Sequence, residues 1–280
     1  MNFRSLLVLL DGDARCHARI RLAAGFAVAH ATHLVGVAPT DAWELPSGLG
    51  AASRGMDDAA AARSEALRRA NQRVEEFLAH CRTAGVASVE AGVHEGNKAA
   101  VVLHHAHCAD LTVIGQADPT RATHREDQRF VEQVLLHNAR PTLLVPHCGR
   151  FDAVGVNVLV AWDDSRSSAR ATADALPLLR HAGQVHLRVW RGEGEGSEGQ
   201  IRKRLETVQR WLIRQGVAAE LRVETTVGAV GDTILAAAAE LGADLIVMGT
   251  YGHSRWTERI LGGATRTALA RSPLPLLMSH

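Results

Sequence analysis

The chain has 280 residues, of which 46% are hydrophobic and 22% are charged, with a formal net charge of +1. This balance excludes the strongly basic surface that nucleic-acid-binding proteins carry. No apolar run approaches the roughly 20 residues of a membrane-spanning helix, and the short run before Asp11 falls below the length of a signal peptide. We therefore expect a cytoplasmic protein of about two domains.

Apolar runs in the first half predict strands, and the segments between them have helical periodicity or composition. The expected strands cover residues 5–10, 33–38, 88–93, 110–114 and 142–146. The expected helices lie near residues 14–30, 57–84, 97–107 and 127–138, and the segment rich in Pro, Gly and Ser at 39–56 is expected to be a loop.

The second half shows the same alternation. Its expected strands cover residues 156–161, 185–190, 219–225, 244–248 and 274–278, and its expected helices cover residues 166–181, 198–215, 230–241 and 263–271. The strand runs are apolar throughout, which is typical of strands buried on both faces of a parallel sheet. The fold class is therefore α/β, with two tandem, doubly wound, five-stranded parallel-sheet domains of Rossmann-like type.

Three apolar segments of the first half return in the same order in the second half. The pairs are Leu6–Asp11 with Val158–Asp163, Ala109–Gly115 with Ala243–Gly249, and Leu143–His147 with Leu276–His280. Ordered similarity at three places indicates an internal duplication. The boundary falls near residues 148–152, so we expect domains at residues 1–149 and 150–280.

A glycine-rich loop follows the fourth expected strand of the second half. Its pattern is Gly249-x2-Gly252-x9-Gly262, and Gly263 then opens the last helix. Glycines let backbone N–H groups approach a ligand closely, and a helix start presents unpaired N–H groups that suit phosphate. His253 and Arg255 add positive charge. The pattern predicts a phosphate site here, whereas simple turn formation is the alternative reading of these glycines.

The whole chain resembles a tandem universal stress protein. The resemblance rests on Val158–Asp163, Asp244–Gly249, the glycine loop and the closing strand Pro273–Met278. It implies the adenine nucleotide alpha hydrolase-like variant of the fold and binding of ATP, alone or with Mg²⁺. In that family the last glycine of the loop precedes Ser or Thr, whereas this chain has Gly263, so one hydroxyl is missing.

The resemblance also implies which residues form the pocket. Asp163 would lie at the nucleoside, Val189 at the adenine and Gly228 beside the pocket, while Asp163 also reads as a helix-capping or turn aspartate. The residues at the phosphate end would be Met248, Gly249, Gly252, His253, Arg255, Gly262, Gly263, Ala264 and Thr265.

The first half lacks this loop. Asp118 stands at the second glycine position, and Glu132 is expected near the start of the last helix. Carboxylates at these positions repel phosphate, so we expect no ATP binding in the first half. Arg121, Arg125 and Arg129 are expected to be solvated surface residues rather than another anion site.

Other chemistry has little support in the sequence. His104 and Cys108 have the i,i+4 spacing of metal ligands, with His94 as a third candidate, but surface histidines are the simpler interpretation. Neither a Gly-x-Ser-x-Gly elbow nor a P-loop is present, and the four cysteines lack CxxC spacing. We therefore expect no metal site and no nucleophilic catalysis.

Three functions remain open at this point. The first is a stress-response module, regulatory or protective, whose nucleotide state changes loop 249–262 and thereby its contact with an unknown protein partner. The second is a slow ATPase, for which Glu258 and Asp163 are the only acidic candidates. The third is a nucleotide-free interaction module. The resemblance further implies that the closing strands of the two halves pair within the chain, with a homodimer as an additional possibility.

Overall fold

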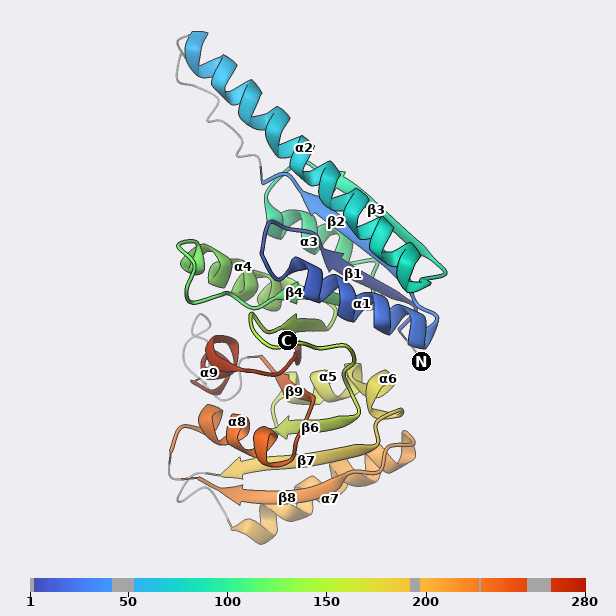
Figure 1. Cartoon of the computed structure of the whole chain (residues 1–280). Helices are drawn as coiled ribbons and strands as arrows, with labels where there is room; N and C mark the ends of the chain where they lie inside the picture. Colours follow the sequence, from blue (N-terminus) through green and yellow to red (C-terminus); the bar gives the residue numbers. More distant parts are fainter. Residues whose placement is uncertain (1–2, 42–52, 192–196, 227, 251–262) are drawn as a thin grey trace. The chain divides into compact units, whose positions relative to one another are not determined.

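Two compact units make up the computed structural model, residues 3–114 and residues 115–280 (Figure 1). The structure describes residues 3–41, 53–191, 197–226, 228–250 and 263–280. The division differs from the repeat boundary expected near residue 149, because the fifth strand packs with strands of the second half.

The unit of residues 3–114 contains parallel strands in the order β3-β2-β1-β4. The strands are β1 (Ser5–Leu9), β2 (His33–Pro39), β3 (Val89–His94) and β4 (Leu111–Gly115). The helices between them are α1 (Cys16–His30), α2 (Ser53–Ala84) and α3 (Lys98–Ala106). Helix α2 packs against α1, β2 and β3, and Figure 1 shows that its N-terminal part extends past the strands.

The unit of residues 115–280 contains strands in the order β5-β10-β9-β6-β7-β8. The strands are β5 (Thr142–Val145), β6 (Asn157–Trp162), β7 (Gln184–Arg191), β8 (Glu220–Thr225), β9 (Leu245–Gly249) and β10 (Leu276–Ser279). The helices are α4 (His124–His137), α5 (Arg166–Asp174), α6 (Leu176–Leu179), α7 (Glu198–Arg214), α8 (Val230–Glu240) and α9 (Gly263–Arg271).

The α/β class and the order of elements predicted from the sequence are confirmed. One expected helix, residues 166–181, is divided into α5 and α6. Pro177 lies in the first turn of α6, where its missing N–H is tolerated, whereas the same residue inside a continuous helix would break a hydrogen bond. Helices α2 and α4 also begin a few residues earlier than expected, at Ser53 and His124.

The closing strands of the two halves pair with each other. Strand β5 runs antiparallel to β10, with Leu144 opposite Leu276 and Thr142 opposite Met278, while β10 runs parallel to β9. The side chains of β5 and β10 are buried. The intra-chain pairing expected for a duplicated chain is thus present in this unit.

Parallel strands bring their carboxyl ends to one edge of the sheet. In Figure 1 the arrowheads of β6, β7 and β8 point toward the same edge. Right-handed crossovers place α5 and α7 on one face and α8 and α9 on the other. Helix α5 accordingly packs on β9 and β10, and α8 packs on α9. Ligand sites in such sheets lie beyond the carboxyl ends, where the winding reverses, which here is between β6 and β9.

In each half, an aspartate carboxylate accepts hydrogen bonds from backbone N–H groups at the start of the first strand. The Asp244 carboxylate accepts hydrogen bonds from the backbone N–H groups of Gly155 (2.9 Å), Val156 (2.9 Å) and Asn157 (3.2 Å). Asp110 does the same for Arg4 (2.8 Å) and Ser5 (3.1 Å). The repeated Ala-Asp-Leu segments are therefore explained by a shared structural role.

We expect Asp244→Ala to lower the free energy of unfolding by about 1–3 kcal/mol, because three backbone donors lose a charged acceptor. Urea denaturation followed by circular dichroism measures the change. Asp152→Ala is the control, since Asp152 forms an exposed ion pair with Arg150 and such pairs contribute little. Equal stability of the wild type and Asp244→Ala would contradict the assigned role.

Candidate functional site

A cavity of about 520 Å³ lies at the carboxyl ends of β6, β7 and β9. Helices α8 and α9 supply its other walls. Its lining residues are Ala161, Trp162, Asp163, Trp190, Ala229, Val230, Ile234, Met248, Gly249, Gly263, Ala264, Thr265, Arg266 and Thr267. The volume falls within the range of small-molecule sites, and the location is where the winding of the sheet reverses.

Asp163 directly follows β6 and lines this cavity. Its Oδ1 accepts a hydrogen bond from the Ser165 backbone N–H at 3.0 Å. Ser165 in turn caps α5, because its Oγ accepts from the Ser168 N–H at 3.0 Å. The two readings of Asp163 are therefore compatible, since it shapes the turn into α5 and also presents a carboxylate to the cavity.

The first turn of α9 forms the opposite wall. Gly263, Ala264 and Thr265 line the cavity together with Arg266 and Thr267. A helix start carries unpaired N–H groups and the positive end of the helix dipole, both of which attract an anion. The residues predicted from the sequence did not include Arg266, although its position one residue after Thr265 could have suggested it.

Six of the predicted site residues line the cavity: Asp163, Met248, Gly249, Gly263, Ala264 and Thr265. Val189 and Gly228 do not line it, but their chain neighbours Trp190 and Ala229 do. Successive side chains of a strand point to opposite faces, so the Val189 side chain lies on the other face of β7 from that of Trp190. Gly252, His253, Arg255, Gly262 and the acidic candidate Glu258 lie outside the described residues.

Gly249 has a steric role in addition to its place in the cavity wall. A Cβ at this position would lie 2.5 Å from the Ser168 backbone nitrogen and 2.6 Å from the Ser167 carbonyl carbon. Gly263 differs, because a Cβ there would meet nothing within 4 Å. Only the first of these glycines is therefore required by close packing of the described residues.

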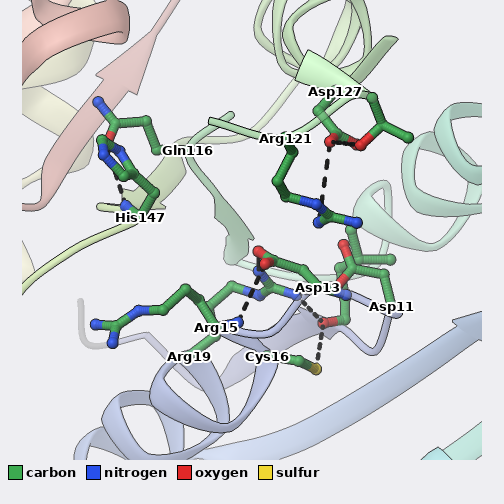
Figure 2. A network of polar contacts seen from close by, with 11 residues as sticks. Asp11, Asp13, Arg15, Cys16, Arg19, Gln116, Arg121, Asp127 and His147 are labelled. Carbon is green, nitrogen blue, oxygen red and sulfur yellow. Dashed lines mark hydrogen bonds and ion pairs between the residues drawn. The ribbon is translucent and has the colours of Figure 1, made fainter. Parts of the chain in front are cut away.

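In the unit of residues 3–114, an arginine forms an ion pair with Asp11, the aspartate that corresponds to Asp163. Arg19 is fully buried and its guanidinium contacts the carboxylate of Asp11 (Figure 2). It also donates to Asp13 Oδ2 at 3.0 Å and to the Leu9 carbonyl at 3.4 Å. Asp11 is thus neutralised within the protein, and it borders a smaller cavity of about 280 Å³, whereas Asp163 lines the cavity of about 520 Å³.

Burial and ion pairing act in opposite directions on this pair. Burial alone raises the pKa of Asp11, but the Arg19 guanidinium, with a further contribution from Lys98, lowers it more, so this pKa lies below its ordinary value. Burial likewise opposes the charged form of Arg19, but Asp11 raises its pKa above the ordinary value. Both groups therefore remain charged at neutral pH.

The prediction that Glu132 lies near the start of the last helix of the first half is wrong. Helix α4 begins at His124, so Glu132 lies inside the helix, where its Oε1 accepts from Gln128 Nε2 at 2.9 Å, and not at the helix start. Acidic residues still occupy the first turn of α4, as Glu126 and Asp127. Asp118 Oδ1 accepts from the Thr120 N–H and hydroxyl, and these hydrogen bonds lower the pKa of Asp118.

Gln116, directly after β4, forms hydrogen bonds with the C-terminal end of α9. Its side-chain amide nitrogen donates to the carbonyls of Leu269 (2.9 Å) and Ser272 (3.4 Å). Its amide oxygen accepts from the His147 backbone N–H (3.1 Å) and lies 2.8 Å from His147 Nδ1 (Figure 2). This buried amide ties a residue of the first repeat to the helix whose start lines the cavity.

The histidine cluster is arranged differently from the metal pattern considered above. Helix α3 ends at Ala106, so Cys108 is not on its face with His104. His94 Nδ1 lies 3.2 Å from His105 Nε2, and burial is the main cause that lowers the pKa of both imidazoles. Within the described ranges, no group of three or more His, Cys, Asp or Glu side chains is arranged to hold a metal ion.

The cysteines show no disulfide: Cys16 and Cys81 are buried free thiols, and Cys108 and Cys148 are exposed free thiols. Burial raises the pKa of Cys81 to about 11, which makes its thiolate form rare at neutral pH. None of the helices in the described part of the chain is both long and apolar enough to cross a membrane.

Residues 156–280 match the model of the universal stress protein family. This match covers the part of the chain that contains the cavity, so residues 156–280 form a universal stress protein domain. No curated protein matches the chain in sequence.

Solved structures show the same fold over the full length. A universal stress protein from Archaeoglobus fulgidus is 18% identical with a TM-score of 0.69, and the alignment covers 100% of this chain and 99% of that chain. A functionally unknown protein from Pseudomonas aeruginosa is 15% identical with a TM-score of 0.61, and the alignment covers 99% of this chain and 92% of that chain.

Another match covers only part of this chain. A universal stress protein in complex with cAMP is 19% identical with a TM-score of 0.36, and the alignment covers 53% of this chain and 100% of that chain.

We expect Gly249→Ala to destabilise the protein by about 1–3 kcal/mol, because the added methyl group overlaps the backbone of α5 and the structure must shift to admit it. Gly263→Ala is the matched control, since its methyl group enters open space and alanine favours a helix. Thermal and urea unfolding of both variants test the contrast. Equal stability of the two variants would show that Gly249 does not pack against α5.

We expect Arg19→Met to lower the free energy of unfolding by about 3–5 kcal/mol at pH 7, because it leaves the Asp11 carboxylate buried without its partner. The pH dependence should change sign. In the wild type the folded pKa of Asp11 is depressed, so its stabilising contribution is present above the unfolded value of 3.8 and is lost as the pH falls. In Arg19→Met the buried acid has a raised pKa, so stability should increase as the pH falls toward 5.

Urea denaturation at several pH values measures both effects. The double variant Asp11→Asn/Arg19→Met is the control, because it removes both charges and should recover part of the stability at pH 7. A stability profile of Arg19→Met parallel to that of the wild type would contradict the ion-pair assignment.

Proposed function

We propose that the second half of this protein binds ATP or a related adenine nucleotide, and that the protein acts as a regulatory or protective module in a stress response. The observation that carries the proposal is the cavity between β6, β7 and β9. A carboxylate, Asp163, and the start of α9 face it from two sides. The first can accept hydrogen bonds from ribose hydroxyls, and the second suits a phosphate group.

The structure of the first half supports one nucleotide per chain. The Arg19 guanidinium pairs with Asp11, the counterpart of Asp163. Separately, acidic residues occupy the first turn of α4, where they would repel a phosphate at that helix start. The first half would then serve as a scaffold, and Gln116 is one contact through which it holds α9.

The proposal extends to the setting in which the protein works. It acts in the cytoplasm, and its nucleotide state is transmitted to a protein partner through loop 249–262, of which residues 251–262 lie outside the described part. Mg²⁺ would accompany ATP. Homodimerisation is a separate, additional proposal. The closing strands β5 and β10 already pair with each other within one chain.

Isothermal titration of the purified chain with ATP and Mg²⁺ tests the proposal, with an expected stoichiometry near one. Mass spectrometry of the denatured protein would show whether a nucleotide co-purifies. Absence of binding up to millimolar ATP would overturn the proposal and favour a nucleotide-free interaction module. Release of ADP over hours would instead identify a slow ATPase.

Gly263→Ser should tighten ATP binding by about 3- to 10-fold, because it restores the family's hydroxyl at the start of α9 and one net hydrogen bond contributes about 0.5–1.5 kcal/mol. The added Cβ meets nothing within 4 Å, so the side chain fits. Gly263→Ala is the control, since it adds the Cβ without the hydroxyl. Identical dissociation constants for the Ser and Ala variants would show that the missing hydroxyl is irrelevant.

A further inference from the structure

Trp190 provides the aromatic wall of the cavity on β7. It is partly buried and lines the cavity near the carboxyl end of that strand. The neighbouring wall is apolar, because Val230 and Ile234 of α8 also line the cavity. An indole beside aliphatic side chains favours a flat, weakly polar ring as its occupant.

Strand register determines the direction of the Trp190 side chain. Met248, Ala161 and Arg188 are register partners on β9, β6 and β7, so their side chains share one face of the sheet. Trp190 is two residues beyond Arg188 and therefore points to the same face. This is the face of α8 and α9, whose residues complete the cavity.

The three chemical features of the cavity lie in order across the sheet. Strand β6 lies between β9 and β7. Asp163 follows β6, Trp190 lies on β7, and α9 is the helix that connects β9 to β10, with its start and Met248 and Gly249 of β9 lining the same cavity. Neighbouring strands are about 4.8 Å apart, so an elongated ligand can contact an anion site, a carboxylate and an aromatic wall in succession.

We propose that Trp190 is the stacking surface for the base and determines a preference for purine over pyrimidine nucleotides. The inference rests on the proposed function, since it assigns the orientation of a nucleotide in that same cavity. The base packs on the indole, the ribose hydroxyls face Asp163, and the phosphates lie at the start of α9. Stacking on an indole favours the larger ring system but distinguishes adenine from guanine only weakly.

Trp211 offers a matched control away from the cavity. It lies on α7, on the face of the sheet opposite α8 and α9. It is not one of the residues that line the cavity. A tryptophan substitution at this position therefore controls for effects that do not involve the cavity.

The test compares the wild type with Trp190→Ala, Trp190→Phe and Trp211→Phe. Isothermal titration with ATP, GTP, CTP and inorganic tripolyphosphate gives the affinities, and circular dichroism confirms folding. We expect Trp190→Ala to weaken ATP binding about 10-fold or more and Trp190→Phe to weaken it less. Trp211→Phe should bind as the wild type does. The wild type should bind ATP and GTP within a few-fold of each other and CTP more weakly.

The base preference separates stacking from a general structural effect. Trp190→Ala should bind ATP and CTP with similar affinity, and its affinity for tripolyphosphate should equal that of the wild type. Wild-type ATP affinity in Trp190→Ala, or an unchanged ATP-to-CTP ratio, would overturn the stacking role alone. A wild-type chain that binds no nucleotide would overturn the proposed function together with this inference. Trp190→Phe covers the case in which the alanine variant does not fold.

Discussion

The antiparallel pairing of β5 with β10 is the contact on which the arrangement of the second unit depends. It places the last strand of the first repeat beside the last strand of the second, with both strands buried. The segments around β5 then join the same unit, and Gln116 reaches the carbonyls at the end of α9. A duplicated chain thus uses one strand pair, and one buried amide, to connect its two repeats at the helix that lines the cavity.

The corresponding aspartates of the two repeats have different surroundings. Asp11 and Asp163 both follow the first strand of their repeat, and each accepts a hydrogen bond from the backbone N–H two residues later. In the first repeat the Arg19 guanidinium neutralises the carboxylate. In the second repeat the carboxylate lines the larger cavity. The two repeats therefore differ in a buried ion pair as well as in the glycine pattern of the sequence.

Much of the fold could be predicted because its signals are local. Uniformly apolar runs and the periodic segments between them predicted the strands and the helix order, and the proline in α6 accounts for the one divided helix. Of the residues predicted for the site, Asp163, Gly263 and Thr265 line the cavity, because they follow a strand end or begin a helix. Trp190 lines it and the predicted Val189 does not, and a buried strand without alternation gives no signal of which side chain faces the cavity.

The sequence by itself determined the elements, the repeat and the edge of the sheet where chemistry belongs, because periodicity, glycine spacing and strand-end aspartates act over a few residues. The tertiary structure decided which face of β7 meets the cavity, that Arg19 neutralises Asp11, and that β5 packs with β10. The strand contacts join segments far apart in the chain, and the Asp11–Arg19 pair, eight residues apart, forms where α1 packs on β1. Their geometry depends on how the strands align and pack, which no local pattern specifies.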